Sequence, residues 1–380
     1  MEGCRDLFDL PDTVAYLNCA NMSPQLRAVT AAGVAAVHGK AAPWPLRPEE
    51  WFAPAERLRT LFGRIVNADA DGIALVPSVS YGIALAAANV KVARGQSIVL
   101  LEGDFPSNVY AWRDLARRCA GAIRAVARPA DGAWTDAVID AIRTDTAVVA
   151  VPNCDWTDGR FVDLVRVGRA ARAVGAALIV DASQSAGAYP LDVSLIQPDF
   201  LVTVGYKWLL GPYGLGYLYA APRWRERGVP LEQSWLTRAG AEDFTRLTDY
   251  VETHRPGARR FDMGEFPQFV LSAMAITALE QVLAWGVDQI QDATAALTLC
   301  AEQRAVHLGA AVVHQRDRVG HMIGIRPRRG ICGSLLAALG AENIYVSIRG
   351  DSIRVAPHLY NTEADMTRLL AVLAADAAGS

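Results

Sequence analysis

The strongest constraint on the fold is a regular alternation of short apolar runs and amphipathic stretches between residues 71 and 220. The apolar runs are predicted to be buried strands, and helical patterns separate most of them. They cover Ile73–Val76, Ser97–Leu101, Ile123–Ala127, Ala147–Val151, Ala177–Val180, Phe200–Val204 and Gly216–Tyr219. Strands that alternate with helices build a mostly parallel sheet with both faces covered. The fold class is therefore predicted to be α/β.

Longer helical patterns flank this core, and the tail of the chain is strand-rich. The helical patterns cover Pro24–His38, Pro48–Ile65, Phe269–Trp285 and Val287–His307, and a closing helix is predicted near Glu363–Ala374. One hydrophobic core rarely grows beyond about 250–300 residues. We therefore expect this chain of 380 residues to form a large domain over residues 31–258 and a smaller α+β domain over residues 259–380, with an N-terminal arm over residues 1–30.

Charge and cysteine usage exclude several classes of function. The net charge is −3 and there is no basic tract, which argues against a nucleic-acid partner. The N-terminus lacks a signal-peptide pattern, and no stretch approaches the roughly 18 apolar residues of a membrane helix. The six cysteines include no C-x-x-C pair, so they are predicted to be reduced and no metal site is expected. We predict a cytoplasmic protein that does not bind membranes.

Candidate ligand-binding residues follow the predicted strands, because ligands bind beyond the carboxyl ends of the strands in open α/β sheets. After the first strand, Ser78, Val79 and Ser80 precede a helical stretch. Free N–H groups and a hydroxyl at such a turn could bind a phosphate, although an ordinary serine N-cap explains the pattern equally well. The glycine-rich fingerprints of nucleotide sites are absent from the strand-to-helix turns, which disfavours a nucleotide cofactor.

Three further strand ends carry groups suited to an aromatic ligand. Phe105 could stack on a flat ring or fold back into the core. Asn153 could reach a ligand oxygen or belong to a plain turn. Asp181 directly follows a fully apolar run, where a carboxylate needs a cation or a donor as partner, and a helix N-cap is the competing explanation.

Lysine is rare in this chain, and one lysine stands at a strand end. Of the 37 lysine and arginine residues only Lys40, Lys91 and Lys207 are lysines. Coding bias alone can explain the shortage, but Lys207 follows an apolar strand and lies between aromatic residues. Burial lowers the pKa of a lysine and frees its amine as a nucleophile. A phosphate seat, a stacking ring, an amide, an acid and this lysine together match pyridoxal 5′-phosphate.

The same motifs resemble the class V aminotransferase family of fold-type I pyridoxal-phosphate enzymes, which also contains cysteine desulfurases, kynureninases and isopenicillin N epimerase-like proteins. The resemblance extends from residues 16–21 to residues 357–362. Its most specific element is Asp-x-x-Gln at Asp181–Gln184 followed by Lys207 in Gly-Tyr-Lys-Trp-Leu-Leu-Gly-Pro. It implies a fold-type I architecture, with a seven-stranded type of sheet in a large cofactor-binding domain and a small C-terminal domain.

The resemblance also implies roles for individual residues. Lys207 would form the internal aldimine and move the Cα proton, and Asp181 would keep the pyridine nitrogen protonated. The cofactor's ring and phosphate would be bound by Phe105, Asn153, Gln184, Val79, Ser80 and Tyr206. Arg354 would bind the substrate carboxylate, and Asn21 would border the substrate. Arg349 would bind a second acidic group of the substrate or pair with Asp351.

Two features bear on the assembly and the reaction. Residues 259–265 resemble a segment that in relatives enters the neighbouring subunit's site, which implies a homodimer with shared active sites; Glu265 replaces a threonine that relatives often have. The segment from Ser347 to Arg354 leaves no room for the cysteine loop of desulfurases. We therefore expect an enzyme that acts on a free α-amino acid by transamination or epimerisation, with a Cβ lyase of kynureninase or C–S lyase type as the alternative, and not a persulfide-forming desulfurase.

Overall fold

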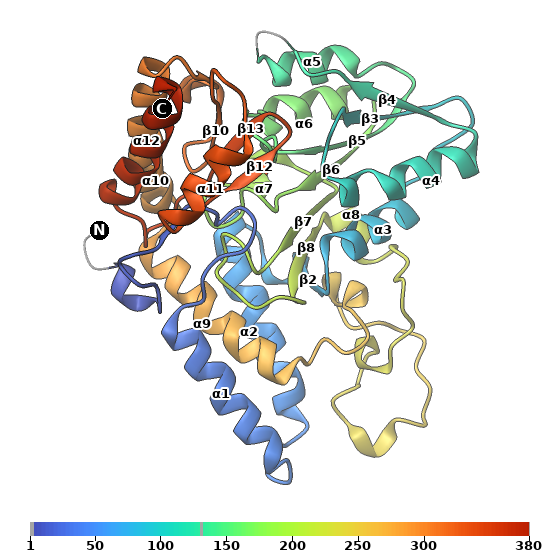
Figure 1. Ribbon diagram of the computed structural model, residues 1–380. Helices are drawn as coiled ribbons and strands as arrows, with labels where there is room; N and C mark the ends of the chain where they lie inside the picture. The colour runs from blue at the N-terminus through green and yellow to red at the C-terminus, as the bar shows by residue number, and fades with distance from the viewer. Residues whose placement is uncertain (1–3, 130–131, 380) are drawn as a thin grey trace.

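A central sheet of seven strands organises the molecule (Figure 1). The computed structural model describes residues 4–129 and 132–379, and within them the strand order of this sheet is β2-β8-β7-β6-β5-β3-β4. The strands are β2 Ile73–Val76, β3 Ser97–Leu101, β4 Ala122–Val126, β5 Thr146–Pro152, β6 Ala177–Asp181, β7 Phe200–Val204 and β8 Gly216–Ala220. Neighbouring strands run parallel except at β8, which is antiparallel to both β2 and β7. The predicted α/β class with a mostly parallel sheet is confirmed.

The reversed direction of β8 follows from the short connection that precedes it. A parallel return needs a crossover of about a dozen residues or more, usually through a helix. Val204 and Gly216 are joined by turns instead, and no helix lies between them. Gly205 lies so close to the returning chain that a Cβ there would be 2.6 Å from the Leu215 carbonyl oxygen. This tight segment holds Lys207 at the carboxyl end of β7.

Helices cover both faces of the sheet, and alternate strand residues belong to separate cores. On one face Ala74, Ile98 and Val148 pack under α3 (Val79–Asn89) and α4 (Tyr110–Cys119). On the other face the neighbouring strand positions Leu75 and Val99 pack under another set of helices. That set includes α2 (Glu49–Val66), α5 (Trp134–Ala141), α6 (Leu164–Ala173) and α9 (Phe269–Trp285). This burial on both faces explains why the strands are fully apolar in sequence.

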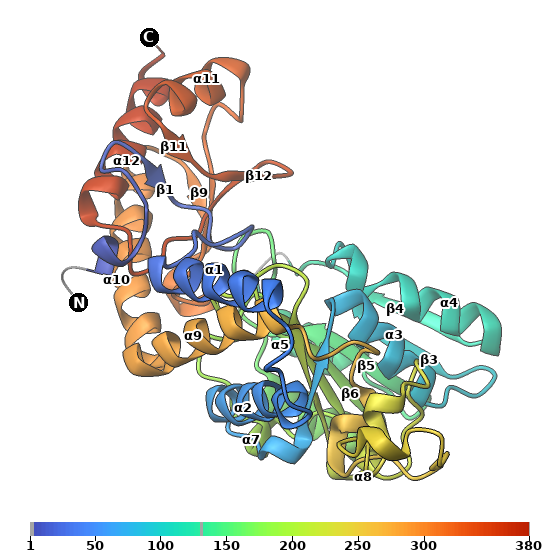
Figure 2. The same cartoon turned by 90° about the horizontal axis from the view of Figure 1, so that it is seen from below.

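An N-terminal segment and the C-terminal part of the chain together build a smaller α+β layer (Figure 2). Its sheet has the order β12-β13-β10-β9 and contains β9 Ala311–Val312, β10 Ile323–Arg326, β12 Ser347–Arg349 and β13 Ser352–Val355. Its helices are α10 Val287–His307, α11 Gly333–Ala341 and α12 Glu363–Ala378. The N-terminal strand β1 (Ala15–Tyr16) pairs in parallel with β11 (Ile344–Tyr345), and α1 (Arg27–Ala41) lies beside α9 in both views. The domain limits at residues 30 and 258 stay a prediction.

A buried ion pair fixes the segment that leads from the large sheet to α9. Arg59 on α2 donates to the Ile73 carbonyl at 2.6 Å and to Asp262 Oδ2 at 2.5 Å. Asp262 Oδ1 in turn accepts the Leu75 N–H at 2.8 Å. Both side chains are fully buried. Residues 257–262 are thereby fastened to the edge strand β2.

Within residues 4–129 and 132–379, no single helix is long and apolar enough to cross a membrane. The helices α9 and α10 meet that requirement only when taken together, and they are bent by 74° where they join. Cytoplasmic localisation stays a prediction.

Replacing Asp262 with alanine is expected to destabilise the fold strongly, since it leaves the Arg59 guanidinium buried without its counter-charge. We expect the free energy of unfolding in guanidinium chloride to fall by about 3–5 kcal/mol. Asp9→Ala is the matched control, because its pair with Arg27 is exposed and should change stability by less than about 1 kcal/mol. Equal losses in the two variants would contradict the anchoring role of Asp262.

Candidate active site

A cavity of about 200 Å³ lies beyond the carboxyl ends of the central strands. Among the residues proposed from the sequence, those that line it are Val79, Ser80, Phe105, Asp181, Gln184, Tyr206 and Lys207. They follow β2, β3, β6 and β7, which are spread across the width of the sheet. The expectation that strand ends converge on one site therefore holds for these residues. Their individual roles toward a ligand stay proposals.

The amine of Lys207 lies in an apolar, aromatic corner of the cavity. Its Nζ is 5.5 Å from the centre of the Phe105 ring and 5.9 Å from the centre of the Tyr206 ring. Burial lowers the pKa of this amine to about 8, and the positive charges of Arg354 and Arg349 act in the same direction, while the negative charge of Asp181 raises it. The neutral, nucleophilic form of the amine is therefore half populated near pH 8, well below the ordinary lysine value of 10.5.

Asp181 ends β6, the strand next to β7. Its Oδ1 accepts a hydrogen bond from the Ser183 N–H at 3.0 Å, and only 6% of the residue is exposed. Burial raises the pKa of this carboxyl group, whereas the hydrogen bonds from Ser183 and the charge of Lys207 lower it. The carboxylate is thus placed to interact with a cationic group of a ligand in the cavity.

The turn before α3 combines a helix cap with a polar lining. Ser78 is the N-cap, and its hydroxyl accepts the Tyr81 N–H at 3.1 Å. The Ser80 hydroxyl lies 2.9 Å from that of Ser78. Val79 and Ser80 occupy the first turn of the helix, where N–H groups have no partner within the helix. The two interpretations of the sequence are compatible, since one serine caps the helix and the next residues line the cavity.

Two aromatic rings form one wall of the cavity. Phe105 is 39% exposed and so does not fold back into the core. Its ring meets that of Trp156 edge to face, with centres 5.5 Å apart. The Trp156 Nε1 donates to the Gly103 carbonyl at 2.9 Å, which fixes the indole. Trp156 was not among the residues proposed from the sequence. The signal that could have found it is its place three residues after Asn153, in a strand-end segment rich in polar and aromatic residues.

The two amides proposed from the sequence are occupied by protein groups. Gln184 lines the cavity, but its Nε2 donates to the Ala20 carbonyl and its Oε1 accepts from Trp208 Nε1, each at 3.0 Å. Asn153 does not line this cavity, because its amide joins the Val162 carbonyl to the Ser185 hydroxyl. The amide of Asn153 therefore supports the strand-end loop, and its proposed contact with a ligand stays a prediction.

Arg354 on β13 is a buried cation with unsatisfied donors. It is 1% exposed, and its Nη1 donates to the Trp156 carbonyl at 2.8 Å. Its Nε and Nη2 are buried and have no hydrogen-bond partner among the described residues. Burial, together with the nearby charge of Arg349, lowers the pKa of this guanidinium to about 9. Buried polar groups are normally paired, so Arg354 is suited to receive an anion.

Asn21, by contrast, is exposed and does not line the cavity. Its backbone N–H donates to the Asn18 carbonyl at 3.0 Å. Its proposed contact with a substrate stays a prediction.

Asp104 is a second carboxyl group in the cavity that sequence reasoning missed. It accepts the Phe105 N–H at 2.6 Å and an N–H of Asn108 at 2.8 Å. Burial, together with the nearby charge of Asp181, raises its pKa to about 7. Its position in a strand-end turn beside Phe105 was the only signal in the sequence.

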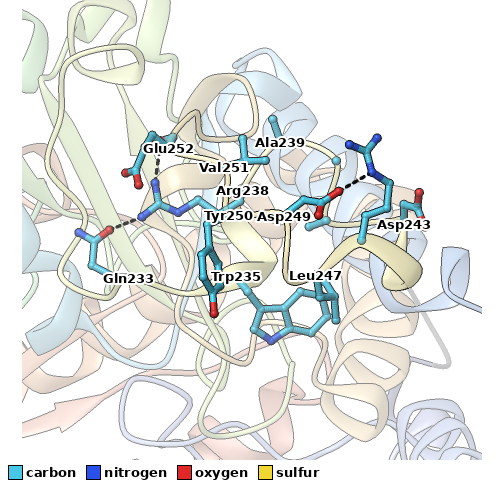
Figure 3. A pocket seen from close by; sticks show the side chains of 13 residues that line it. Gln233, Trp235, Arg238, Ala239, Asp243, Leu247, Asp249, Tyr250, Val251 and Glu252 are labelled. Carbon is cyan, nitrogen blue, oxygen red and sulfur yellow. Dashed lines mark hydrogen bonds and ion pairs between the residues drawn. The ribbon is translucent and has the colours of Figure 1, made fainter.

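A separate cavity of about 480 Å³ lies within the loop segment 233–252 (Figure 3). None of the strand-end residues lines it. Arg238 donates to the Glu252 carbonyl and to Gln233 Oε1, both at 2.7 Å, and Arg246 pairs with Asp249 at 2.9 Å. Both arginines that line this cavity therefore already have partners within the protein.

Comparisons with known proteins agree on the family and differ in the activities of the relatives. The family model for aminotransferase class-V matches residues 47–369. An uncharacterized aminotransferase, YcbU, of Bacillus subtilis is 27% identical over 329 residues, which cover 86% of this chain and 85% of the relative. A kynureninase of Deinococcus radiodurans is 31% identical over 281 residues, which cover 71% of this chain and 66% of the relative.

The similarity in three dimensions extends over the whole chain. The apo structure of a cysteine desulfurase from Thermococcus onnurineus NA1 superposes with a TM-score of 0.86 and 18% sequence identity, covering 99% of this chain and 98% of that chain. At this identity the likeness establishes the fold, and the chemistry has to be argued from the site.

Uptake of pyridoxal 5′-phosphate by the cofactor-free protein is expected to depend on pH through Lys207. Below pH 8 the rate should rise about tenfold per pH unit, because the neutral amine is the nucleophile, and it should level off above pH 8. Asp181→Asn should move the midpoint to lower pH, since the carboxylate raises the pKa of the amine. Stopped-flow absorbance measures the rate, with methylamine as the reference for ionisation of the cofactor itself. A midpoint near the ordinary lysine value of 10.5 would contradict the assigned environment.

Proposed function

The chain belongs to the aminotransferase class-V family, and we propose that it transaminates or epimerises a free α-amino acid with Lys207 as the central catalytic residue. It is an enzyme that depends on pyridoxal 5′-phosphate. The observation that carries the proposal is the buried amine of Lys207, whose pKa is lowered to about 8 by burial and which shares one cavity with Asp181. The other lysines, Lys40 and Lys91, are both exposed, so Lys207 is the only lysine in this setting.

The residues around the cavity fit the parts of this cofactor. Val79 and Ser80 at the start of α3 would bind the phosphate, together with the Tyr206 hydroxyl. Asp181 would hold the proton on the pyridine nitrogen, and Phe105 would stack on the ring. When bound, the cofactor supplies an electron sink for the pair of electrons released at the substrate Cα.

The protein's own groups would position the substrate and move its proton. Arg354 would bind the α-carboxylate through its two unpaired donors. With that carboxylate held, the Lys207 amine would take the proton from Cα and return one. The outcome then depends on which atom receives the returned proton, and the described contacts support transamination and epimerisation equally.

A Cβ lyase of kynureninase or C–S lyase type is the second candidate. The aromatic surroundings of Lys207 favour it, because Phe105 and Tyr206 both lie within 6 Å of the amine and Tyr213 packs on Tyr206 with ring centres 4.5 Å apart. Such a wall would accommodate a flat or apolar leaving group beyond Cβ.

Persulfide-forming desulfurase chemistry is not part of the proposal. Strands β12 and β13 are joined by a tight turn at residues 350–351, which leaves no loop to carry a cysteine. The exposed Cys332 lies at the start of α11, and its sulfur is 3.0 Å from the Ser334 hydroxyl, outside the cavity. Cys154 lines the cavity, but burial raises the pKa of its thiol far above the usual range.

We also propose a homodimer whose partner completes each site. Large aromatic side chains are exposed on the surface of the single chain, including Trp44 at 81%, Tyr213 at 68% and Tyr250 at 89%. Such exposure is unusual for an aromatic side chain that faces only solvent. Glu265 lies in the segment 259–265 that would enter the partner's site, so its role is part of this proposal.

Lys207→Ala is expected to abolish turnover and the visible absorption of the bound cofactor, because no other amine in the cavity can replace it. Lys91→Ala is the matched control and should retain both. The wild type is then incubated with a panel of amino acids, with and without an added keto acid. Transamination requires the keto acid, epimerisation changes only the chirality of the amino acid, and a lyase releases a Cβ fragment without an acceptor. A colourless wild type that ignores the added cofactor would refute the proposed function.

Arg354→Gln should separate substrate binding from cofactor binding and from stability. We expect the KM for the amino acid to rise about ten- to a hundredfold, because charged hydrogen bonds to its carboxylate are lost. The affinity for the cofactor should change little. The free energy of unfolding should stay the same or rise, because Arg354 keeps two buried donors unpaired in the free protein. Equal losses of substrate and cofactor affinity would contradict this role.

A further inference from the structure

The small sheet presents one apolar face and one polar face. Ile323, Ile325, Ile353 and Val355 belong to the core of the small layer. In the antiparallel register Ser347 lies opposite Arg354, and Arg349 lies opposite Ser352. Because side chains alternate along a strand, these four residues share the other face. That face packs closely on the strand-end loop of the large sheet, since a Cβ at Gly324 would be 2.5 Å from the Asp158 Cβ.

Three arginines occupy the polar face, and their partners differ. Arg326 is neutralised by Asp158 at 3.2 Å and by Asp351 at 2.9 Å. Arg354 and Arg349 have no carboxylate within ion-pair distance among the described residues. The sequence offered a pair between Arg349 and Asp351 as one explanation, and the structure gives Asp351 to Arg326 instead. Two neighbouring cations therefore lack a counter-charge.

Arg349 is held in place without being neutralised. Its Nη1 donates to the adjacent Ile348 carbonyl at 2.7 Å, and its Nε is buried without a partner. Its guanidinium lies 5.4 Å from the centre of the Trp156 ring. Stacking on an aromatic ring restricts the guanidinium plane and leaves its N–H edge available for a planar anion.

Trp156 connects Arg349 with the strand-end cavity. The same indole lines both that cavity and an open hollow of about 850 Å³ that contains Arg349. Its backbone carbonyl accepts from Arg354. Both arginines also lower the pKa of the Lys207 amine, so both lie within electrostatic range of the reacting group. A substrate bound at Lys207 could thus extend past Trp156 toward Arg349.

The other charges in the hollow do not compete for this role. Arg128 pairs with Asp155 at 2.8 Å and Asp158 at 2.7 Å, and Arg160 lies 3.5 Å from Asp158. Glu102 lies on the same hollow and is exposed. Arg349 is consequently the lining cation that has no acidic partner in the described chain.

We propose that the substrate is an acidic amino acid, with Arg349 binding its side-chain carboxylate while Arg354 binds its α-carboxylate. This inference rests on the proposed function and specifies its substrate class. A carboxylate suits the guanidinium because its two oxygens match the N–H edge that the stacked geometry leaves free. The hollow is open enough to admit a side chain of the length of aspartate or glutamate.

The test compares acidic amino acids with their amides on the holoenzyme. Aspartate and glutamate should react with lower KM than asparagine and glutamine. Arg349→Gln should raise the KM for the acids about ten- to a hundredfold and leave the amides nearly unchanged. Arg349→Lys should restore part of the preference. Arg326→Gln is the matched control, since it removes one positive charge from the same face and should leave the preference intact.

Binding of unreactive dicarboxylates separates this inference from the proposed function. Isothermal titration of the holoenzyme should show that succinate and glutarate bind more tightly than their monoamides. Arg349→Gln should remove this difference in affinity. If this binding pattern is found but no amino acid is turned over, the proposed function is refuted and the role of Arg349 in binding is not. Equal binding of diacid and monoamide by the wild type, or equal effects of the Arg349 and Arg326 variants, would overturn the role of Arg349. The role would also be overturned if Arg349→Gln changed the oligomeric state and left the preference for dicarboxylates unchanged. That result would assign Arg349 to a subunit contact.

Discussion

The site depends on a pair of charges that the fold removes from water. Lys207 follows β7 and Asp181 ends β6, two adjacent parallel strands that are buried on both faces. Burial lowers the pKa of the amine and raises that of the carboxyl group, so desolvation drives both groups toward neutrality while their mutual attraction opposes it. Two cores hold the strands, and the strands hold both groups at the cavity. The fold thus brings the neutral, nucleophilic form of the amine closer to neutral pH than in an ordinary lysine, beside a buried acid.

The small layer contributes the complementary half of the site. Its polar face brings unpaired guanidinium groups to the strand-end loop, where the Trp156 carbonyl and ring orient Arg354 and Arg349. Each unpaired cation costs folding free energy, since a buried donor without a partner loses its hydration. Pairing with substrate carboxylates would recover that cost only when the correct ligand binds. On the proposed roles of Arg354 and Arg349, substrate selection and local instability would have the same physical origin.

Much of the fold was predictable because fully buried strands are continuous apolar runs. The bounds of β3 and β7 agree with the prediction at both ends, as do those of α9 and α10. The bounds of β11 and β12 in the tail could not be predicted in the same way, since strands of two or three residues carry no periodic signal. The site followed from the strand-end rule, which placed Lys207 and Phe105 in the cavity. Sequence could not reveal that the amide of Asn153 is used by Ser185, nor that Trp156 joins two cavities, because both depend on loop conformation.

The most direct test of the central claim uses the rarity of lysine. The chain offers only Lys40, Lys91 and Lys207 as side-chain amines for attachment of the cofactor. Borohydride reduction of the holoenzyme, followed by proteolysis and peptide mass spectrometry, locates the attached group. The account predicts the cofactor mass on the peptide that contains Lys207 and on neither other lysine. Attachment at Lys40 or Lys91, or the absence of any modified peptide from a protein saturated with cofactor, would contradict it.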